Sequence, residues 1–186
     1  MKKDFGTKTI VTPLPVLIVA TYDENGTPDA MNVAWGGQCG GKHIALNLSK
    51  HKTTDNLQLK KAFTVSFADK KNLVIADYFG LESGRDADKI TKAGVHVTKS
   101  TNVDAPIIDE FPLTLECKVV SMNEELGELR VVGEVVNMSA DESIIDENGN
   151  IDFDKLQPLS FDSATGSYRV LGEKVGNAFK DGAVLK

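Results

Sequence analysis

The sequence has little of what several protein classes depend on. Only two of its 186 residues are cysteines, Cys39 and Cys117, and they lie far apart, so neither a disulfide framework nor a zinc site is indicated. Acidic residues outnumber basic ones, 27 to 21, which argues against a broad face for nucleic acid or for a membrane. The apolar stretch at residues 16–20 is too short for a signal peptide or a membrane span. We therefore expect a soluble protein of the reducing cytoplasm that binds neither nucleic acid nor membrane.

The first third of the chain predicts short β-strands joined by tight turns. Apolar, β-rich patterns cover residues 15–21, 29–35, 43–49 and 63–67. The Asn25-Gly26 pair predicts a hairpin between the first two strands, because a tight reversal needs residues that tolerate positive φ. Before the fourth strand, the run TTDN from residue 53 predicts the cap of a short helix that continues through residues 58–61.

The remaining two thirds predict a helical segment, a long hairpin and an exposed end. Residues 73–94 are helical in character, and residues 101–112 form a polar, proline-containing connection. Residues 167–171 predict a short strand, and the last dozen residues predict a tail. A 186-residue chain with 41% hydrophobic residues can bury a sizeable core. We therefore predict one domain over residues 1–186, mainly β with helical insertions, with a barrel core at about 10–140 and a C-terminal extension at about 141–186.

The long hairpin is predicted over residues 113–122 and 128–138, around Gly127. Its first strand alternates Leu115, Cys117 and Val119 with a second set, Glu116, Lys118 and Val120. Because successive strand residues point to opposite faces, one face is predicted to be buried and the other, with Glu116, to be wetter.

A glycine-rich segment is the most informative candidate for binding chemistry. Residues 32–41 read NVAWGGQCGG, a strand that runs into four glycines within six residues. Glycine lets a ligand approach the backbone and frees amide groups to point at an anion. A bulged strand that leaves the sheet would have the same glycine-rich sequence, so a binding segment and a bulge both stay open as interpretations. The spacing and the missing helix exclude a Rossmann fingerprint.

A second candidate is the strand-to-helix junction SKHKTT at residues 49–54. Free amides at a helix start, lysines and hydroxyls together suit a phosphate, although ordinary helix capping is equally consistent with the pattern. A third candidate is the run SGRDADK at residues 83–89, which on charge alone favours a self-paired, solvated surface cluster over a ligand-facing loop. No metal-binding spacing links His43, His51 and His96. The DENG run from residue 146 indicates a turn and lacks the acid of a calcium loop.

These segments, in this order, resemble the flavin reductase-like family, and within it the flavoredoxin branch. The matching pieces are PVLIV from residue 15, MNVAWGG from 31, KTT and NL from 52, SGRDADK from 83, LECKVV from 115 and GEVV from 133. The resemblance extends to Leu159 and covers nearly the whole chain. Each piece is weak, but the ordered set is fairly specific.

The resemblance implies an FMN-binding split β-barrel of the Greek-key type that forms a homodimer. It implies that the phosphate and ribityl chain of FMN lie against residues 34–39 and 49–54. The cofactor-binding residues that it implies are Ala34, Trp35, Gly36, Gly37, Gln38, Cys39, Ser49, Lys52, Thr53, Thr54, Arg85, Asp88 and Lys89. Relatives often have arginine in place of Lys52 and a hydroxyl residue in place of Cys39. Because lysine lacks the bidentate fork of arginine, looser binding of the phosphate is implied.

The function that the resemblance implies is that of a flavin reductase, in which NADH or NADPH passes a hydride to FMN, or of a flavoredoxin-like electron-transfer protein with a redox protein partner. The cofactor carries this chemistry, so no catalytic residue is assigned. Two alternatives stay open. One is a non-catalytic FMN carrier or storage protein, and the other is a split-barrel protein that binds another ligand, such as heme.

Overall fold

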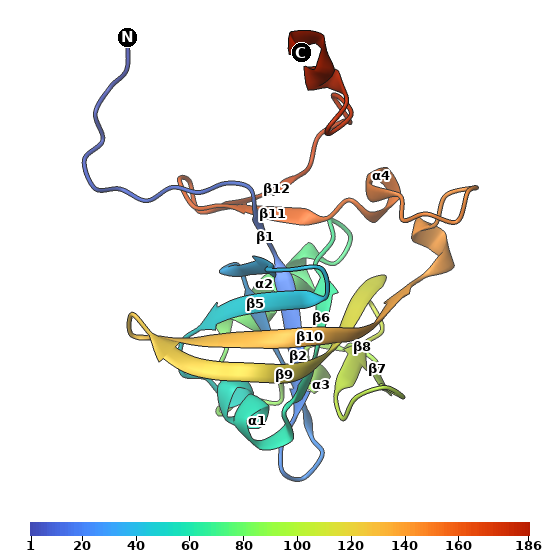
Figure 1. The fold of residues 1–186 in the computed structure, drawn as a ribbon. Helices are drawn as coiled ribbons and strands as arrows, with labels where there is room; N and C mark the ends of the chain where they lie inside the picture. Colours follow the sequence, from blue (N-terminus) through green and yellow to red (C-terminus); the bar gives the residue numbers. More distant parts are fainter.

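Seven antiparallel strands form one sheet whose two edges are consecutive in the sequence. The computed structural model describes all residues 1–186. The strands of this sheet, in chain order, are β2 (Leu17–Tyr22), β3 (Pro28–Val33), β4 (Gly36–Gln38), β5 (His43–Leu48), β6 (Ala62–Phe67), β9 (Leu113–Glu125) and β10 (Glu128–Ala140). They lie in the order β3-β2-β6-β9-β10-β5-β4. Because only Ala34 and Trp35 separate β3 from β4, the two edges meet at one seam and the sheet curls into a barrel (Figure 1).

The interior of the barrel is filled by side chains. Leu46, Phe63 and Val131 are fully buried in its apolar cluster. A Cβ atom on Gly133 would overlap the Phe63 ring, and the pairing of β9 and β10 shifts register next to this glycine. A glycine and a bulge at this position let β10 bend around the large ring.

Helices cover one end and one side of the barrel. Helix α1 (Lys52–Lys60) closes the end through Leu57, which belongs to the barrel cluster. A second apolar cluster lies on the outer side of β2 and β3, under α2 (Leu73–Leu81), α3 (Lys89–Ala93) and the ladder of β7 (Val97–Lys99) with β8 (Pro106–Ile108). Strand β2 is therefore buried on both faces.

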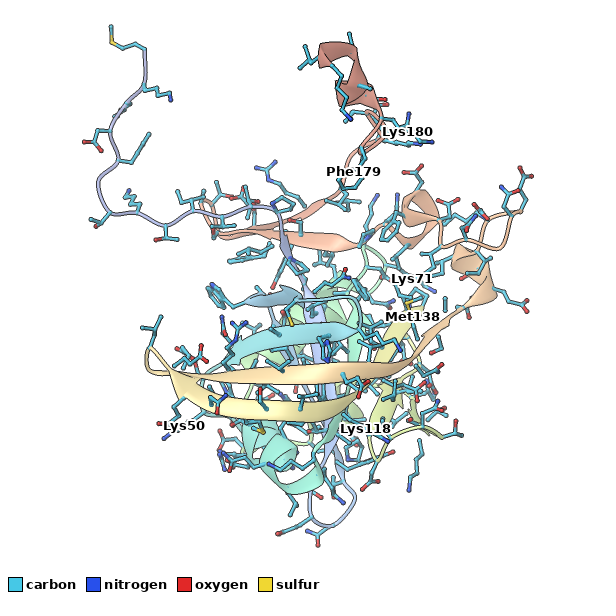
Figure 2. All side chains as sticks on the ribbon, viewed as in Figure 1. Lys50, Lys71, Lys118, Met138, Phe179 and Lys180 are labelled. Atoms are coloured by element: carbon cyan, nitrogen blue, oxygen red, sulfur yellow. The ribbon has the colours of Figure 1, made fainter.

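A small sheet and two extended termini complete the chain. The sheet consists of β1 (Leu14–Pro15), β11 (Leu159–Asp162) and β12 (Ser167–Val170). Between β10 and β11 lie η1 (Glu142–Ile144) and α4 (Phe153–Leu156). Residues 1–13 and 171–186 are exposed and leave the barrel on the same side (Figure 1). The tail includes η2 (Asp181–Leu185), and Phe179 and Lys180 lie on it far from the barrel (Figure 2). No helix is both long and apolar enough to cross a membrane.

The prediction of a mainly β barrel with helical insertions is confirmed, and the predicted strands lie within a few residues of those observed. Two details differ. The predicted helical segment 73–94 is interrupted between α2 and α3, and the polar connection 101–112 contains β8. The prediction that Glu116 lies on a wet face is wrong: Glu116 is buried and accepts hydrogen bonds from Ser100 and Asn102 of the loop before β8.

Candidate functional site

Three adjoining clefts lie along the seam between β3 and β4. Trp35 and Arg130 line both the largest cleft, of about 530 Å³, and a second cleft of about 460 Å³. Asn32 and His51 line both the largest cleft and a third of about 90 Å³. The shared walls join the clefts into one groove. Its narrow end lies at the start of α1 and its wide end at β4.

The narrow end is built on the first turn of α1. The Thr54 hydroxyl accepts a hydrogen bond from the His51 amide at 3.0 Å and donates one to the His51 carbonyl at 2.7 Å, so the helix begins directly after His51. The amides of Lys52 and Thr53 have no acceptor among the turn and loop hydrogen bonds of the chain, as is usual for a first turn. Free amides and the positive end of the helix dipole favour an anion here.

Lys52 points its charge toward the turn between β2 and β3. Its Nζ lies 3.3 Å from the Asp23 carboxylate. The same carboxylate accepts hydrogen bonds from the amides of Asn25 and Thr27 at 2.9 Å. Burial raises the pKa of Asp23, but these amides and the Lys52 ammonium outweigh it and hold the pKa below its ordinary value. Lys52 is thus a cation at the rim of the groove with one partially exposed partner.

Asp29 of β3 forms the floor of the narrow end. Its side chain is only 3% exposed, accepts a hydrogen bond from the Thr53 hydroxyl at 2.8 Å, and lies 3.7 Å from the Nζ of Lys89. Burial lowers the pKa of Lys89, and the negative charge of Asp29 opposes this shift. Asp29 therefore joins α1 and α3 beneath the groove.

The loop of residues 83–89 covers the other side of the narrow end. Asp88 caps α3 by accepting hydrogen bonds from the Thr91 hydroxyl at 2.6 Å and the Thr91 amide at 3.0 Å, and these bonds lower the pKa of Asp88. Arg85 reaches α1, where its Nη2 lies 2.5 Å from the Asp55 carboxylate. The loop is consequently held at both of its ends, one of them against the first turn of α1.

The wide end presents backbone and an aromatic ring. Trp35 is 62% exposed, and its carbonyl accepts a hydrogen bond from the Asn47 amide at 2.8 Å. Residues 36–39 line the second cleft together with Thr9 and Val11 of the N-terminal segment. The Gln38 side chain donates to the Gly40 carbonyl at 3.0 Å. This end offers an exposed indole and a glycine backbone that a planar ring can approach closely.

Most of the residues predicted for the site lie along this groove. One or more of its clefts are lined by Ala34, Trp35, Gly36, Gly37, Gln38, Cys39, Ser49, Lys52, Thr53 and Lys89, and Arg85 and Asp88 line a shallow cleft that adjoins the narrow end. Thr54 does not line it, since its hydroxyl is used to cap α1. The Ser49 hydroxyl donates to Glu128 at 2.9 Å.

Sequence reasoning missed two residues of the groove. Asp29 is one, although an aspartate inside a strand is unusual and was a usable signal. Arg130 of β10 is the other, and it lines both large clefts with only a loose contact, 3.9 Å, to Glu125. Nothing in its local sequence distinguishes Arg130 from a surface residue of a hairpin.

The donor set of the groove fits FMN. A phosphate needs positive charge and hydrogen-bond donors, and the narrow end supplies both through Lys52, Arg85 and the free amides of α1. A flavin ring needs an open, partly apolar wall, and the wide end supplies it at Trp35 and Gly37, where a Cβ atom would meet nothing within 4 Å.

Comparison with known proteins agrees with this geometry. Residues 10–162 match the model of the flavin reductase like domain. The flavoredoxin of Desulfovibrio vulgaris (Miyazaki F) is 33% identical, with a TM-score of 0.93 over 98% of this chain and 100% of that one. The flavoredoxin of Methanosarcina acetivorans is 27% identical, with a TM-score of 0.91 over all of both chains. An uncharacterized protein of Aquifex aeolicus is 24% identical over 81% of each chain. The chain therefore belongs to the flavin reductase-like, FMN-binding family.

Proposed function

We propose that this protein is an FMN-binding flavoprotein that oxidises NADH or NADPH and passes the electrons on through the flavin. The observation that carries the proposal is the polarity of the groove. Its narrow end gathers Lys52, Arg85 and free helix amides, and its wide end exposes Trp35 above a glycine backbone. That arrangement matches a ligand with a phosphate at one end and a planar ring at the other.

The residues of the groove divide into two proposed groups. The residues proposed to surround the phosphate are Ser49, Lys52, Thr53, Arg85 and Lys89, with Thr54 and Asp88 holding the starts of α1 and α3 in place. The ring and ribityl group consists of Ala34, Trp35, Gly36, Gly37, Gln38 and Cys39. When bound, FMN supplies the redox chemistry. The chain binds and orients it, and no side chain is assigned as an acid or a base.

We propose that FMN exchanges readily. Lysine at position 52 offers a point charge and not the bidentate fork of arginine. The Lys52 ammonium also has a competing partner, Asp23, at 3.3 Å. Both features weaken retention of the phosphate, as suits a protein for which flavin is a substrate as much as a cofactor.

We also propose a homodimer, which would shield the open groove. The terminal segments, residues 1–13 and 171–186, carry six basic and three acidic residues. Residues 14–170 carry 15 basic and 24 acidic residues. These basic segments are exposed along their length, and Thr9 and Val11 line the second cleft. Their charge complements the acidic body of a second copy. Multi-angle light scattering at micromolar concentration tests this, and a monomeric mass would contradict it.

The absorption spectrum of the purified protein tests the flavin proposal. Flavin bands that survive desalting after FMN is added, followed by FMN-dependent consumption of NADH or NADPH, are the expected results. A spectrum that stays bare at saturating FMN contradicts it.

A second candidate is electron transfer from a redox protein, favoured because two similar structures, with TM-scores of 0.93 and 0.91, are flavoredoxins. Bound FMN with no turnover of either nicotinamide would support this candidate over the reductase.

A further inference from the structure

We propose that Asp29 is a positioning residue for phosphate recognition: from beneath the groove it fixes Thr53 of α1 and Lys89 of α3 in one arrangement, without itself contacting the ligand. This inference rests on the proposed FMN binding. It assigns a role to a residue of β3 that belongs to none of the three segments from which binding was predicted.

The Asp29 carboxylate is buried and has a partner at each oxygen. Asp29 and Lys89 have side chains that are 3% and 4% exposed, and their charges lie 3.7 Å apart. The other Asp29 oxygen accepts the Thr53 hydroxyl at 2.8 Å. Both oxygens are therefore engaged by residues that line the narrow end of the groove. A buried carboxylate with a partner at each oxygen holds those partners in place.

The loop of residues 83–89 packs closely against Asp29. A Cβ atom on Gly84 would overlap the Asp29 carboxylate, so the loop backbone lies directly against Asp29. Glycine at position 84 is what permits this approach. The same carboxylate thus contacts α1, α3 and the loop that carries Arg85, which are the three segments around the narrow end.

The buried ammonium of Lys89 depends on Asp29 as its main counter-charge. Besides Asp29, its Nζ has one hydrogen-bond acceptor, the Phe79 carbonyl at 3.5 Å, and the Glu82 carboxylate attracts it more weakly than Asp29 does. A buried ammonium without a counter-charge is strongly disfavoured. Without Asp29, Lys89 must leave its position or lose its proton, and either change removes a fixed positive charge from the narrow end.

The three cations at the narrow end therefore differ in kind. Arg85 and its partner Asp55 are more than half exposed, and the Lys52 and Asp23 side chains are 25% and 16% exposed, so both pairs remain open to solvent and a phosphate can displace their carboxylates. Lys89 has a buried partner that a phosphate cannot displace. We infer that Lys52 and Arg85 exchange their carboxylates for the ligand, whereas the Asp29–Lys89 pair stays intact and sets the geometry.

Comparison of FMN with riboflavin, which lacks the phosphate, tests this role. Dissociation constants are measured by flavin fluorescence quenching for the full chain and for Asp29→Asn, which keeps the shape and removes the charge. We expect Asp29→Asn to weaken FMN binding about tenfold or more and to change riboflavin binding by less than about twofold. Glu116→Gln is the matched control, because Glu116 is an equally buried carboxylate outside the groove, and it should leave both constants unchanged.

The double variant Asp29→Asn, Lys89→Met separates positioning from stability. It removes both buried charges, so it restores stability that the single variant loses, and thermal unfolding followed by circular dichroism measures this. FMN binding should stay weak in the double variant. Recovery of FMN affinity together with stability would overturn the inference, as would an Asp29→Asn protein that keeps the preference for FMN over riboflavin. Wild-type protein that binds neither flavin would instead overturn the proposed function.

Discussion

Two buried carboxylates, Asp29 and Glu116, differ in what surrounds them. Each is almost completely hidden from solvent. Glu116 accepts hydrogen bonds from neutral donors only, the hydroxyl of Ser100 and the amides of Asn102 and Asn137. Asp29 is bound by one hydroxyl and by the ammonium of Lys89.

The partners of the two buried carboxylates lie in different parts of the molecule. The donors to Glu116 tie the loop of residues 100–105 to β9 and β10, and none of them lines the groove. The partners of Asp29 both line it. Burial alone therefore does not mark a binding site; the chemistry and location of the partners do.

The largest expected effect is on stability, at Glu116. Glu116→Ala leaves three donors without an acceptor, and we expect a loss of about 3 kcal/mol in the free energy of unfolding. Urea denaturation followed by circular dichroism measures this loss. FMN affinity of the folded protein should be unchanged within about twofold. A fall in FMN affinity that parallels the loss of stability would contradict the assignment of a purely structural role to Glu116, in contrast to Asp29.

The next effect is on ligand binding, at Lys52. Lys52→Met removes one charge-assisted contact, and we expect the FMN dissociation constant to rise about tenfold while that of riboflavin stays the same. Lys52→Arg should tighten FMN binding, because the guanidinium can hold the phosphate with two bonds. Lys50→Met is the control, since Lys50 is exposed and lies outside the groove. An equal effect of both methionine variants would mean that general charge, and not a local contact, attracts the flavin.

The ionised form of Glu116 should also make stability depend on pH, by a smaller amount. Burial raises the pKa of Glu116, but the hydrogen bonds from Ser100, Asn137 and Asn102 outweigh it and hold the pKa below the ordinary value of 4.5. A carboxylate with a lowered folded-state pKa stabilises the fold above its unfolded-state pKa, and this contribution disappears as the pH falls through the folded-state pKa. The unfolding midpoint should therefore fall less between pH 6 and pH 3 in Glu116→Gln than in the wild type. Parallel pH profiles would contradict this account.

The sequence predicted the barrel strands from local patterns, and most of the residues that the resemblance implied for the site line the groove. Alternating apolar residues identify strands wherever one face is buried, and glycines and hydroxyls at strand ends indicate where a ligand can approach. Both misjudged acids depend on distant contacts. Asp29 is covered by residues 53 and 89, and Glu116 by a loop whose path no local pattern determines. The ladder of β7 and β8 was missed because strands of three residues are too short to show an alternation of apolar and polar residues.

The smallest expected effect tests whether exposed ion pairs compete with the ligand. Asp55→Asn frees Arg85 from its carboxylate, whose side chain is more than half exposed. An exposed pair contributes at most about 1 kcal/mol, so FMN binding should tighten by about two- to threefold, with riboflavin unaffected. Asp154→Asn, a first-turn acid of α4 far along the chain from the groove, is the matched control for the loss of a helix-dipole interaction. If Asp55→Asn instead weakens FMN binding, Asp55 holds Arg85 in its binding position, and the exposed pair then serves the same purpose as the buried one at Asp29.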